Sequence, residues 1–342
     1  MLEVRHPKRR LGYGWLYSLI LLICLAMALS SAPSSAAREA TAGGGIAAGG
    51  EEDFSAAQPN GLPQGIVVGM PPVATEPWIC SAQELWAGKL LLIDGSHPIP
   101  YQAPPPNTLS VAAGGAAARS SQTVAAQEVT AALKDWFAAA RQKGFGSPVV
   151  WAGTRSKAQQ LDWQLEQLRL YAQDCSLLEA AQRTAREREA PGCSEHQTGY
   201  AVDIRLCEGY NQPPDDQPLS HSAPGQYLLA TAWRYGFIHR YNEKDPPLCP
   251  EEAYHFRYVG VAHARMMALL EKSFPDYLAF LREHRAVCYY EGGALRTLIL
   301  CEEVSGDWRL NRPQGAAQAQ VSMDNTGYAV ALFTFDPNPP PA

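Results

Sequence analysis

Three side chains in two separate segments of the chain could together hold a metal ion. His196 and Asp203 stand seven positions apart with Gly199 between them, and His255 follows about fifty residues later. If the chain turns at Gly199, His196 and Asp203 face each other on adjacent strands, with β-carbons roughly 4.5–5.5 Å apart. Two imidazoles and one carboxylate suit zinc and leave a fourth position open for water. We therefore predict a catalytic Zn²⁺ site formed by His196, Asp203 and His255.

A carboxylate three positions before His255 is placed to act as a general base. Glu252 could accept a proton from the attacking water and pass it to the leaving amine, a role that typically contributes 10²–10⁴-fold to the rate. Its neighbour Glu251 is the alternative for this role. A rival ligand set that uses Cys193 or Cys207 is also open, because Cys193 stands three positions before the first histidine.

The two segments carry motifs that resemble a known family. They read S-x-H-x-x-G-x-A-x-D and, further on, E-x-aromatic-H-F-R-Y. This pattern is similar to that of the LAS metallopeptidases, and most closely to VanY-type D-alanyl-D-alanine carboxypeptidases, over Trp86 to Arg285. The resemblance implies the same three zinc ligands and selects Glu252 as the base. One departure is Tyr254, where the family usually has tryptophan, which leaves the substrate preference open.

Four further residues are candidates for contact with a peptide substrate. An arginine at the position of Arg155 binds the substrate carboxylate or the oxyanion in similar enzymes, and a guanidinium offers two parallel hydrogen bonds to a carboxylate. Each candidate also has a purely structural alternative: an arginine is usually exposed, Gln159 could only cap its helix, Ser194 could only fix the hairpin, and Tyr254 could only pack.

The order of the expected elements predicts an α+β fold, with helices packed on a central antiparallel sheet and a small C-terminal β extension. The resemblance implies the LAS/hedgehog-like zinc peptidase form of that fold. Apolar residues at helical spacing predict helices, and β-rich runs between turn residues predict strands. The expected helices are 122–143, 156–171, 176–189, 226–235, 261–272 and 275–284; the expected strands are 89–94, 148–153, 237–241, 254–259, 287–291, 294–304 and 320–335, the last with a turn at 325–327.

Composition divides the chain into four parts. Residues 1–36 have a basic start and a long uncharged run, which predicts a signal peptide or an N-terminal membrane anchor. Residues 37–77 are rich in Ala, Gly and Pro and are expected to be a flexible linker. Residues 78–285 are the expected zinc carboxypeptidase domain, and 286–342 the C-terminal β-rich extension, either a layer on that domain or a small module. The protein is therefore expected outside the cytoplasm, in the cell envelope.

Charge and cysteine content limit the partners. The net charge is −6 and the pI is about 5.8, which argues against nucleic acid as a partner. Eight cysteines, seven of them beyond residue 36, fit an oxidising compartment. A disulfide between Cys193 and Cys207 is one possible pairing, and Cys207 with Cys249 is the rival. Cys288 and Cys301 would need a longer loop to pair.

The leading prediction is a monomeric carboxypeptidase whose substrate is the peptidoglycan stem peptide. The same metal chemistry would serve an L,D-carboxypeptidase, a D-Ala-D-Ala dipeptidase or a wall endopeptidase, because these differ in pocket length and chirality. A zinc-stabilised binding module without catalysis is the alternative from another class. Such a module would not need Glu252 beside an intact set of ligands.

Overall fold

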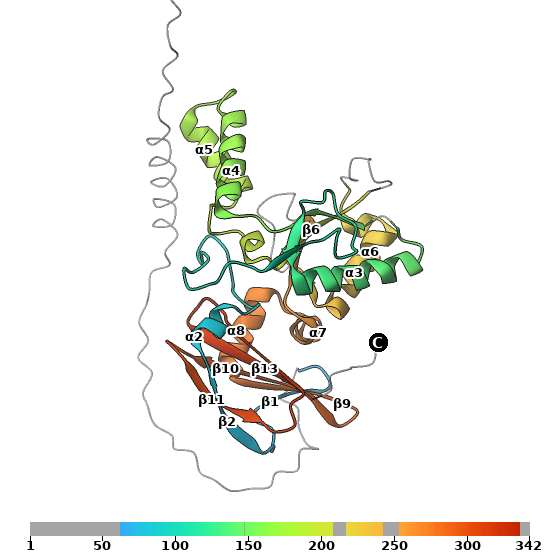
Figure 1. Ribbon diagram of the computed structural model, residues 1–342, viewed down its shortest axis with the longest axis vertical. Coiled ribbons are helices and arrows are strands. Elements are labelled where there is room, and N and C mark those ends of the chain that lie inside the picture. Colours follow the sequence, from blue (N-terminus) through green and yellow to red (C-terminus); the bar gives the residue numbers. More distant parts are fainter. Residues whose placement is uncertain (1–61, 147, 208–216, 242–252, 336–342) are drawn as a thin grey trace, which may run out of the picture.

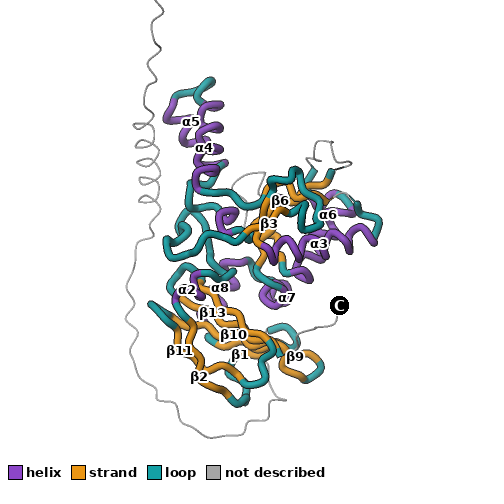
Figure 2. The backbone as a smooth tube through the Cα atoms, in the orientation of Figure 1, coloured by secondary structure: helices purple, strands orange, loops and turns teal. Residues whose placement is uncertain are grey.

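The computed structural model describes residues 62–146, 148–207, 217–241 and 253–335, in which helices pack against antiparallel sheets (Figures 1 and 2). One sheet carries two of the three candidate metal ligands, and a larger one is formed mainly by the C-terminal strands. The predicted α+β class is therefore confirmed. Among these residues, no helix is both long and apolar enough to cross a membrane.

The sheet that positions the site has four antiparallel strands in the spatial order β5-β6-β8-β7. Asp203 on β6 pairs directly with His255 on β8. This register places two candidate ligands side by side near the centre of the sheet, because opposed residues of neighbouring strands lie on the same face. The strands are β5 (Pro148–Ala152), β6 (Ala201–Leu206), β7 (Phe237–His239) and β8 (His255–Tyr258).

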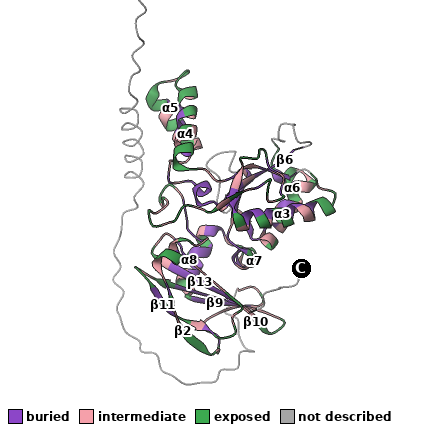
Figure 3. Ribbon diagram, viewed as in Figure 1, coloured by how far each residue is buried: buried purple, intermediate pink, exposed green. Residues whose placement is uncertain are grey.

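Helix α3 (Gln127–Gln142) covers this sheet and anchors its core. Val129, Leu133, Trp136 and Phe137 recur at helical spacing and are buried against residues of all four strands (Figure 3). The Trp136 ring stacks on Phe237 of β7 at 5.1 Å between ring centroids, and its indole nitrogen donates to Thr231. The helix therefore fixes the strands that carry the ligands. Thr231 belongs to a segment made of η2 (Leu219–His221), α6 (Ala223–Thr231) and η3 (Ala232–Tyr235).

Helices α4 (Lys157–Tyr171) and α5 (Leu177–Glu187) form a pair that projects from the sheet (Figures 1 and 2). The predicted capping box begins α4: Ser156 accepts from the Gln159 backbone, and the Gln159 side chain accepts from the Ser156 backbone. A small apolar cluster joins the two helices, built on Leu165, Leu168 and Ala180. Because α4 begins just after Arg155, this cap also fixes the backbone beside that candidate residue.

The larger sheet has five strands in the order β1-β9-β10-β13-β12, and a two-stranded ribbon of β11 and β2 accompanies it. Helices α7 and α8 share one apolar cluster with the five-stranded sheet, and the β11–β2 ribbon shares another with it. The sheet is therefore buried on both faces. The elements are β1 (Ile66–Val68), β2 (Thr75–Cys80), α7 (Val261–Leu270), α8 (Phe274–His284), β9 (Ala286–Glu291), β10 (Ala294–Glu303), β11 (Trp308–Pro313), β12 (Gln318–Met323) and β13 (Tyr328–Thr334). Three short elements complete the described fold: α2 (Ala82–Trp86), β3 (Thr108–Ser110) and β4 (Val124–Ala126).

Some expectations are wrong at the N-terminal side. Residues 62–77, expected to belong to a linker, contain β1 and the start of β2, and Ile66 of β1, an edge strand of the large sheet, is fully buried. The expected strand 89–94 is not a strand; the Leu90 backbone instead donates to the Ser322 side chain. Both segments owe their structure to C-terminal residues more than two hundred positions away, which local patterns do not reveal. The limits of the predicted domains stay a prediction.

Candidate metal centre

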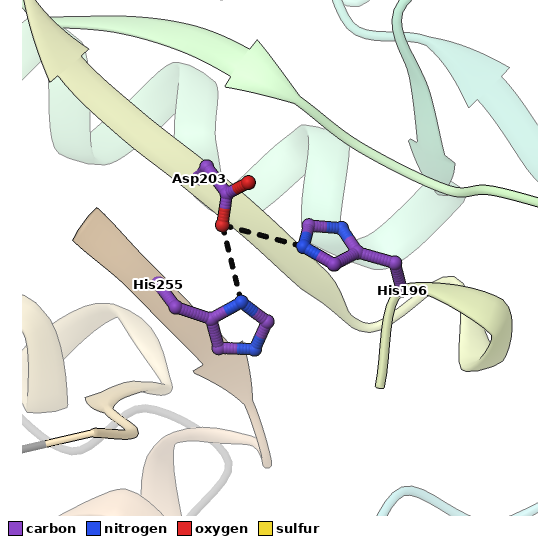
Figure 4. A group of neighbouring side chains, drawn as sticks. All are labelled: His196, Asp203 and His255. Carbon is purple, nitrogen blue, oxygen red and sulfur yellow. Dashed lines mark hydrogen bonds and ion pairs between the residues drawn. The ribbon is translucent and has the colours of Figure 1, made fainter. Parts of the chain in front are cut away.

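Three side chains from three elements converge on one point (Figure 4). His196 lies in the 3-10 turn η1 (Glu195–Thr198), Asp203 on β6 and His255 at the start of β8. Asp203 Oδ1 lies 3.3 Å from His196 Nε2 and 3.1 Å from His255 Nδ1. One ligand atom from each residue lies within 4.8 Å of the other two. The structure therefore brings together the three residues that the motifs selected as metal ligands.

The expected hairpin between His196 and Asp203 is wrong. His196 lies in a 3-10 turn rather than on a strand, and Gly199 ends that turn in the left-handed region with φ +79°. A residue with a β-carbon at this position would also lie 2.6 Å from Pro106. Gly199 thus turns the chain directly from the His196 turn into β6, and Asp203 faces His255 rather than His196 across the sheet.

Hydrogen bonds at the outer ring nitrogen fix the orientation of His196. Its Nδ1 lies 2.7 Å from the Gly153 carbonyl oxygen, which can only accept, so Nδ1 carries the proton and donates. In the neutral ring, Nε2 then presents a lone pair toward the Asp203 carboxylate. Two acceptors that face each other in a buried site repel unless a cation or a proton lies between them. This geometry is that of a metal ligand held by a backbone carbonyl.

His255 is held from both sides by carboxylates. Its Nδ1 faces Asp203, and its Nε2 lies 3.1 Å from Glu195 Oε2. Glu195 is fully buried, and its other oxygen receives Arg240 Nε and Arg257 Nη1, each at 3.2 Å. The sequence reasoning did not select Glu195, Arg240 or Arg257 as functional residues. Glu195 and Arg257 could have been selected from the sequence, because each lies inside one of the two motifs that carry the histidines.

The two histidines have opposite shifts in pKa. Burial, reinforced by the charge of Arg155, lowers the pKa of His196 to about 4, although Asp203 acts in the other direction. Burial would also lower the pKa of His255, but hydrogen bonds to Asp203 and Glu195 outweigh it and raise that pKa to about 9. Burial opposes ionisation of Asp203, yet the two histidines hold its pKa well below the usual range. At neutral pH the metal-free site thus contains an ionised Asp203 and a protonated His255.

Arg155 lies beside this centre, as expected. Its backbone N–H donates to the His196 carbonyl oxygen at 3.2 Å, at the turn between β5 and α4. Its guanidinium carbon lies over the Trp163 ring, 4.3 Å from the centroid, and Arg188 lies over the same ring at 4.0 Å. A planar guanidinium can offer two parallel N–H groups to a carboxylate. Trp163 and Arg188 are neighbours of the candidate site that sequence reasoning did not select.

The other candidate contacts differ in their placement. Gln159 is exposed and serves the capping box of α4, and Ser194 is completely buried. Tyr254 is buried in the core, where its hydroxyl donates to the Gln217 carbonyl oxygen and its ring lies beneath Arg205. Gln159 and Tyr254 therefore have the structural roles that were the alternatives to substrate contact, and Ser194 is closed to solvent. Contact of these three residues with a substrate stays a prediction. Glu252 and its neighbour Glu251 lie outside the described residues.

No disulfide joins two of the described cysteines. The predicted disulfide between Cys193 and Cys207 is not formed and is therefore wrong for this structure. Cys288 and Cys301 are not joined either; they lie in different apolar clusters. Cys249, the rival partner of Cys207, lies outside the described residues. No described cysteine belongs to the group of potential ligands, so within the described residues the rival ligand set that uses Cys193 or Cys207 is not formed.

Comparison with known proteins gives this arrangement a family. Residues 122–261, which contain all three ligands, match the family model described as VanY, D-alanyl-D-alanine carboxypeptidase. This stretch is a VanY-type domain. It extends from the residues just before α3 to the start of α7, and so includes the whole four-stranded sheet. The resemblance noted from the two motifs is confirmed.

Similar curated proteins are described as D-Ala-D-Ala peptidases. The chain is 37% identical over 97 residues to the bifunctional D-Ala-D-Ala dipeptidase and D-Ala-D-Ala carboxypeptidase VanXYC of Enterococcus gallinarum, and this match covers 26% of the chain and 50% of that protein. It is 31% identical over 135 residues to a D-alanyl-D-alanine carboxypeptidase of Enterococcus faecalis, covering 39% of this chain and 47% of that one. The chain thus spans about half the length of the curated relatives it matches.

A solved structure shares the fold of the VanY-type domain and of much of the remaining chain. The vancomycin-resistance D,D-dipeptidase VanXYg, solved in complex with a D-Ala-D-Ala phosphinate analogue, superposes with a TM-score of 0.62 at 21% identity. The match covers 76% of this chain and 99% of that one. The predicted LAS-type fold is therefore confirmed.

Proposed function

We propose that this chain is an exported, zinc-dependent D-alanyl-D-alanine carboxypeptidase, which removes the terminal D-alanine of peptidoglycan stem peptides as a monomer. One observation carries the metal part of the proposal. His196 Nε2, Asp203 Oδ1 and His255 Nδ1 point at one another, with the carboxylate oxygen 3.1–3.3 Å from both nitrogens. The lone pair of His196 Nε2 and the Asp203 carboxylate face each other in a largely buried site, and a cation between them would stabilise this arrangement.

The residues present fit zinc. Two imidazole nitrogens and one carboxylate oxygen are a ligand set of catalytic zinc sites, and three protein ligands leave one position open. The side chain of Asp203 keeps 17% of its surface exposed, while those of the two histidines are almost completely buried, so solvent meets the site on the Asp203 side. Bound zinc would lower the pKa of a water molecule to around 7 and polarise the scissile carbonyl.

The remaining chemistry falls to side chains of the chain itself. Glu252 is the proposed general base that takes a proton from the attacking water and gives it to the leaving amine. Arg155, whose guanidinium carbon lies over the Trp163 ring and whose backbone is bound to His196, is the proposed partner of the substrate's terminal carboxylate. A free carboxylate next to the cleaved bond is what distinguishes a carboxypeptidase substrate from the interior of a peptide. This pairing would make the enzyme select chain ends.

The match to the VanY family model and the descriptions of the enterococcal relatives support D-Ala-D-Ala as the recognised unit. A substrate in the cell wall requires the protein to act outside the cytoplasm, so residues 1–36 are proposed to direct export or to anchor the chain. Cleavage of an L,D bond, release of a D-Ala-D-Ala dipeptide and binding without catalysis would each give a different product pattern.

The test is product analysis with purified protein. The zinc-loaded protein is incubated with a stem pentapeptide, a stem tetrapeptide and free D-Ala-D-Ala, each with and without a chelator. We expect D-alanine and the tetrapeptide from the pentapeptide only, and restoration of this activity when zinc is returned. D-alanine released mainly from the tetrapeptide would indicate L,D cleavage, and zinc binding without any product would indicate a binding module. Either result would overturn the proposal.

A further inference from the structure

A buried carboxylate, that of Glu195, lies behind one of the candidate metal ligands, His255. Glu195 immediately precedes His196 in the sequence and has no exposed surface. Its Oε2 lies 3.1 Å from His255 Nε2, and its Oε1 lies 3.2 Å from Arg240 Nε and from Arg257 Nη1. A carboxylate without access to water is retained at a site only when such partners balance its charge.

We propose that Glu195 is a positioning residue that fixes the ring and the tautomer of His255 for metal binding; the inference rests on the metal site of the proposed function. An ionised carboxylate only accepts hydrogen bonds, so the Nε2–H of His255 donates to it. In the neutral ring the lone pair is then on Nδ1, the nitrogen that faces Asp203. Rotation of the ring by half a turn would move both nitrogens away from these partners, so the hydrogen bond also fixes the orientation of the ring.

The two arginines keep Glu195 in place and charged. Both guanidinium groups bind the same oxygen, which leaves the second oxygen to His255. Arg257 is itself anchored, because its Nη2 donates to the Lys89 carbonyl at 2.8 Å and the Leu91 carbonyl at 3.2 Å. The carboxylate therefore cannot rotate toward another partner without losing its ion pair with the anchored Arg257.

The division of the two oxygens argues against a purely structural ion pair. A carboxylate that served only the two arginines could offer one oxygen to each of them. Here both arginines share Oε1, and Oε2 is directed at the ligand. His196 is held in the same way by a different acceptor, the Gly153 carbonyl. Each histidine thus has its outer nitrogen bound to an acceptor and its inner nitrogen directed at Asp203, which is the arrangement of an oriented metal ligand.

The test compares two variants that each remove a buried carboxylate charge. In Glu195→Gln the amide oxygen is expected to stay with the two arginines, so that an N–H₂ donor replaces the acceptor behind His255. Asp324→Asn is the matched control, because Asp324 is also completely buried and paired with an arginine, Arg282, at 2.9 Å, but lies in the turn between β12 and β13 of the large sheet. The zinc dissociation constant is measured by competition with a chromophoric chelator, beside the free energy of unfolding of each metal-free variant.

Loss of a hydrogen-bond partner behind a metal ligand typically weakens metal binding 10–100-fold. We expect a loss of this size for Glu195→Gln, and zinc affinity within about twofold of wild type for Asp324→Asn, although both variants lose stability. Equal zinc affinity of wild type and Glu195→Gln would overturn the inference. Failure of the wild-type protein to bind zinc would instead overturn the proposed function.

A second measurement does not depend on a variant that folds. In ¹⁵N-histidine NMR spectra of the zinc-loaded wild type, we expect the His255 signals of an Nε2–H tautomer, with a slowly exchanging ring proton that correlates with Nε2. Metal bound through Nε2, or an Nε2 proton that exchanges as fast as that of an exposed histidine, would contradict the positioning role.

Discussion

In the metal-free protein at neutral pH, we expect His255 to be protonated on the nitrogen that would otherwise bind the metal ion. Asp203 and Glu195 on its two sides raise the pKa of His255 to about 9. Burial and the nearby Arg155 lower the pKa of His196 to about 4. Between these values the metal-free site should therefore contain one neutral and one protonated histidine, although the two rings are only 4.8 Å apart.

The effect on stability follows from these directions. Because folding raises the pKa of His255 from 6.5 to about 9, its protonation stabilises the folded metal-free protein fully below pH 6.5. This stabilisation is lost as the pH rises through 9. At roughly 1.4 kcal/mol per pKa unit, the full contribution is about 3 kcal/mol. His196 acts in the opposite sense, since its lowered pKa gives stability that is present above pH 6.5 and lost as the pH falls through 4.

Zinc must displace the His255 proton, so its affinity should rise with pH. Below pH 9 we expect about a tenfold gain in zinc affinity per pH unit from this residue alone. The assay is an NMR pH titration of ¹⁵N-labelled histidines in chelator-treated protein, with urea unfolding at pH 6 and pH 10 as the stability readout. The Asp203→Asn variant is the control and should move the pKa of His255 downward. A His255 that titrates near 6.5 in the wild type would refute the reasoning, as would equal contributions to stability at the two pH values.

Three further outcomes are expected. Glu252→Gln should lower kcat by about 10²–10⁴-fold while the zinc stoichiometry stays at that of the wild type, because a general base is not a ligand; unchanged kcat would exclude this role. Trp163→Leu removes the ring beneath Arg155, and with about 0.5–1 kcal/mol for an exposed cation–π contact it should raise KM for the pentapeptide two- to fivefold. KM for the pentapeptide amide, which lacks the carboxylate, should stay constant, and an equal rise for both would contradict the role of Arg155. Trp136→Ala should cost about 3–5 kcal/mol of unfolding free energy in urea, because the side chain is fully buried; a loss below 1 kcal/mol would show that α3 does not anchor the sheet.

Local patterns were enough for the elements whose hydrogen bonds close within a few residues. The capping box of Ser156 and Gln159 and the apolar stripe of α3 were both predicted correctly, because a helix satisfies its backbone within four positions. The sequence also predicted β7 and β8, and helices α7 and α8, which precede the C-terminal strands of the large sheet. The hairpin at Gly199 failed, since a glycine with positive φ fits a two-residue turn and the end of a 3-10 helix equally well.

The sequence alone was enough to select the three candidate ligands, because side-chain chemistry does not depend on how the chain reaches the site. Two histidines and an aspartate in a specific spacing indicate a metal before any fold is known. The network behind them was decided by tertiary structure alone. Glu195 meets Arg240 and Arg257 across more than forty positions, and nothing local distinguishes a buried glutamate from an exposed one. The same holds for β1 and β2, whose partners β9 and β11 lie at the other end of the chain, because strand pairing is a long-range choice made by burial.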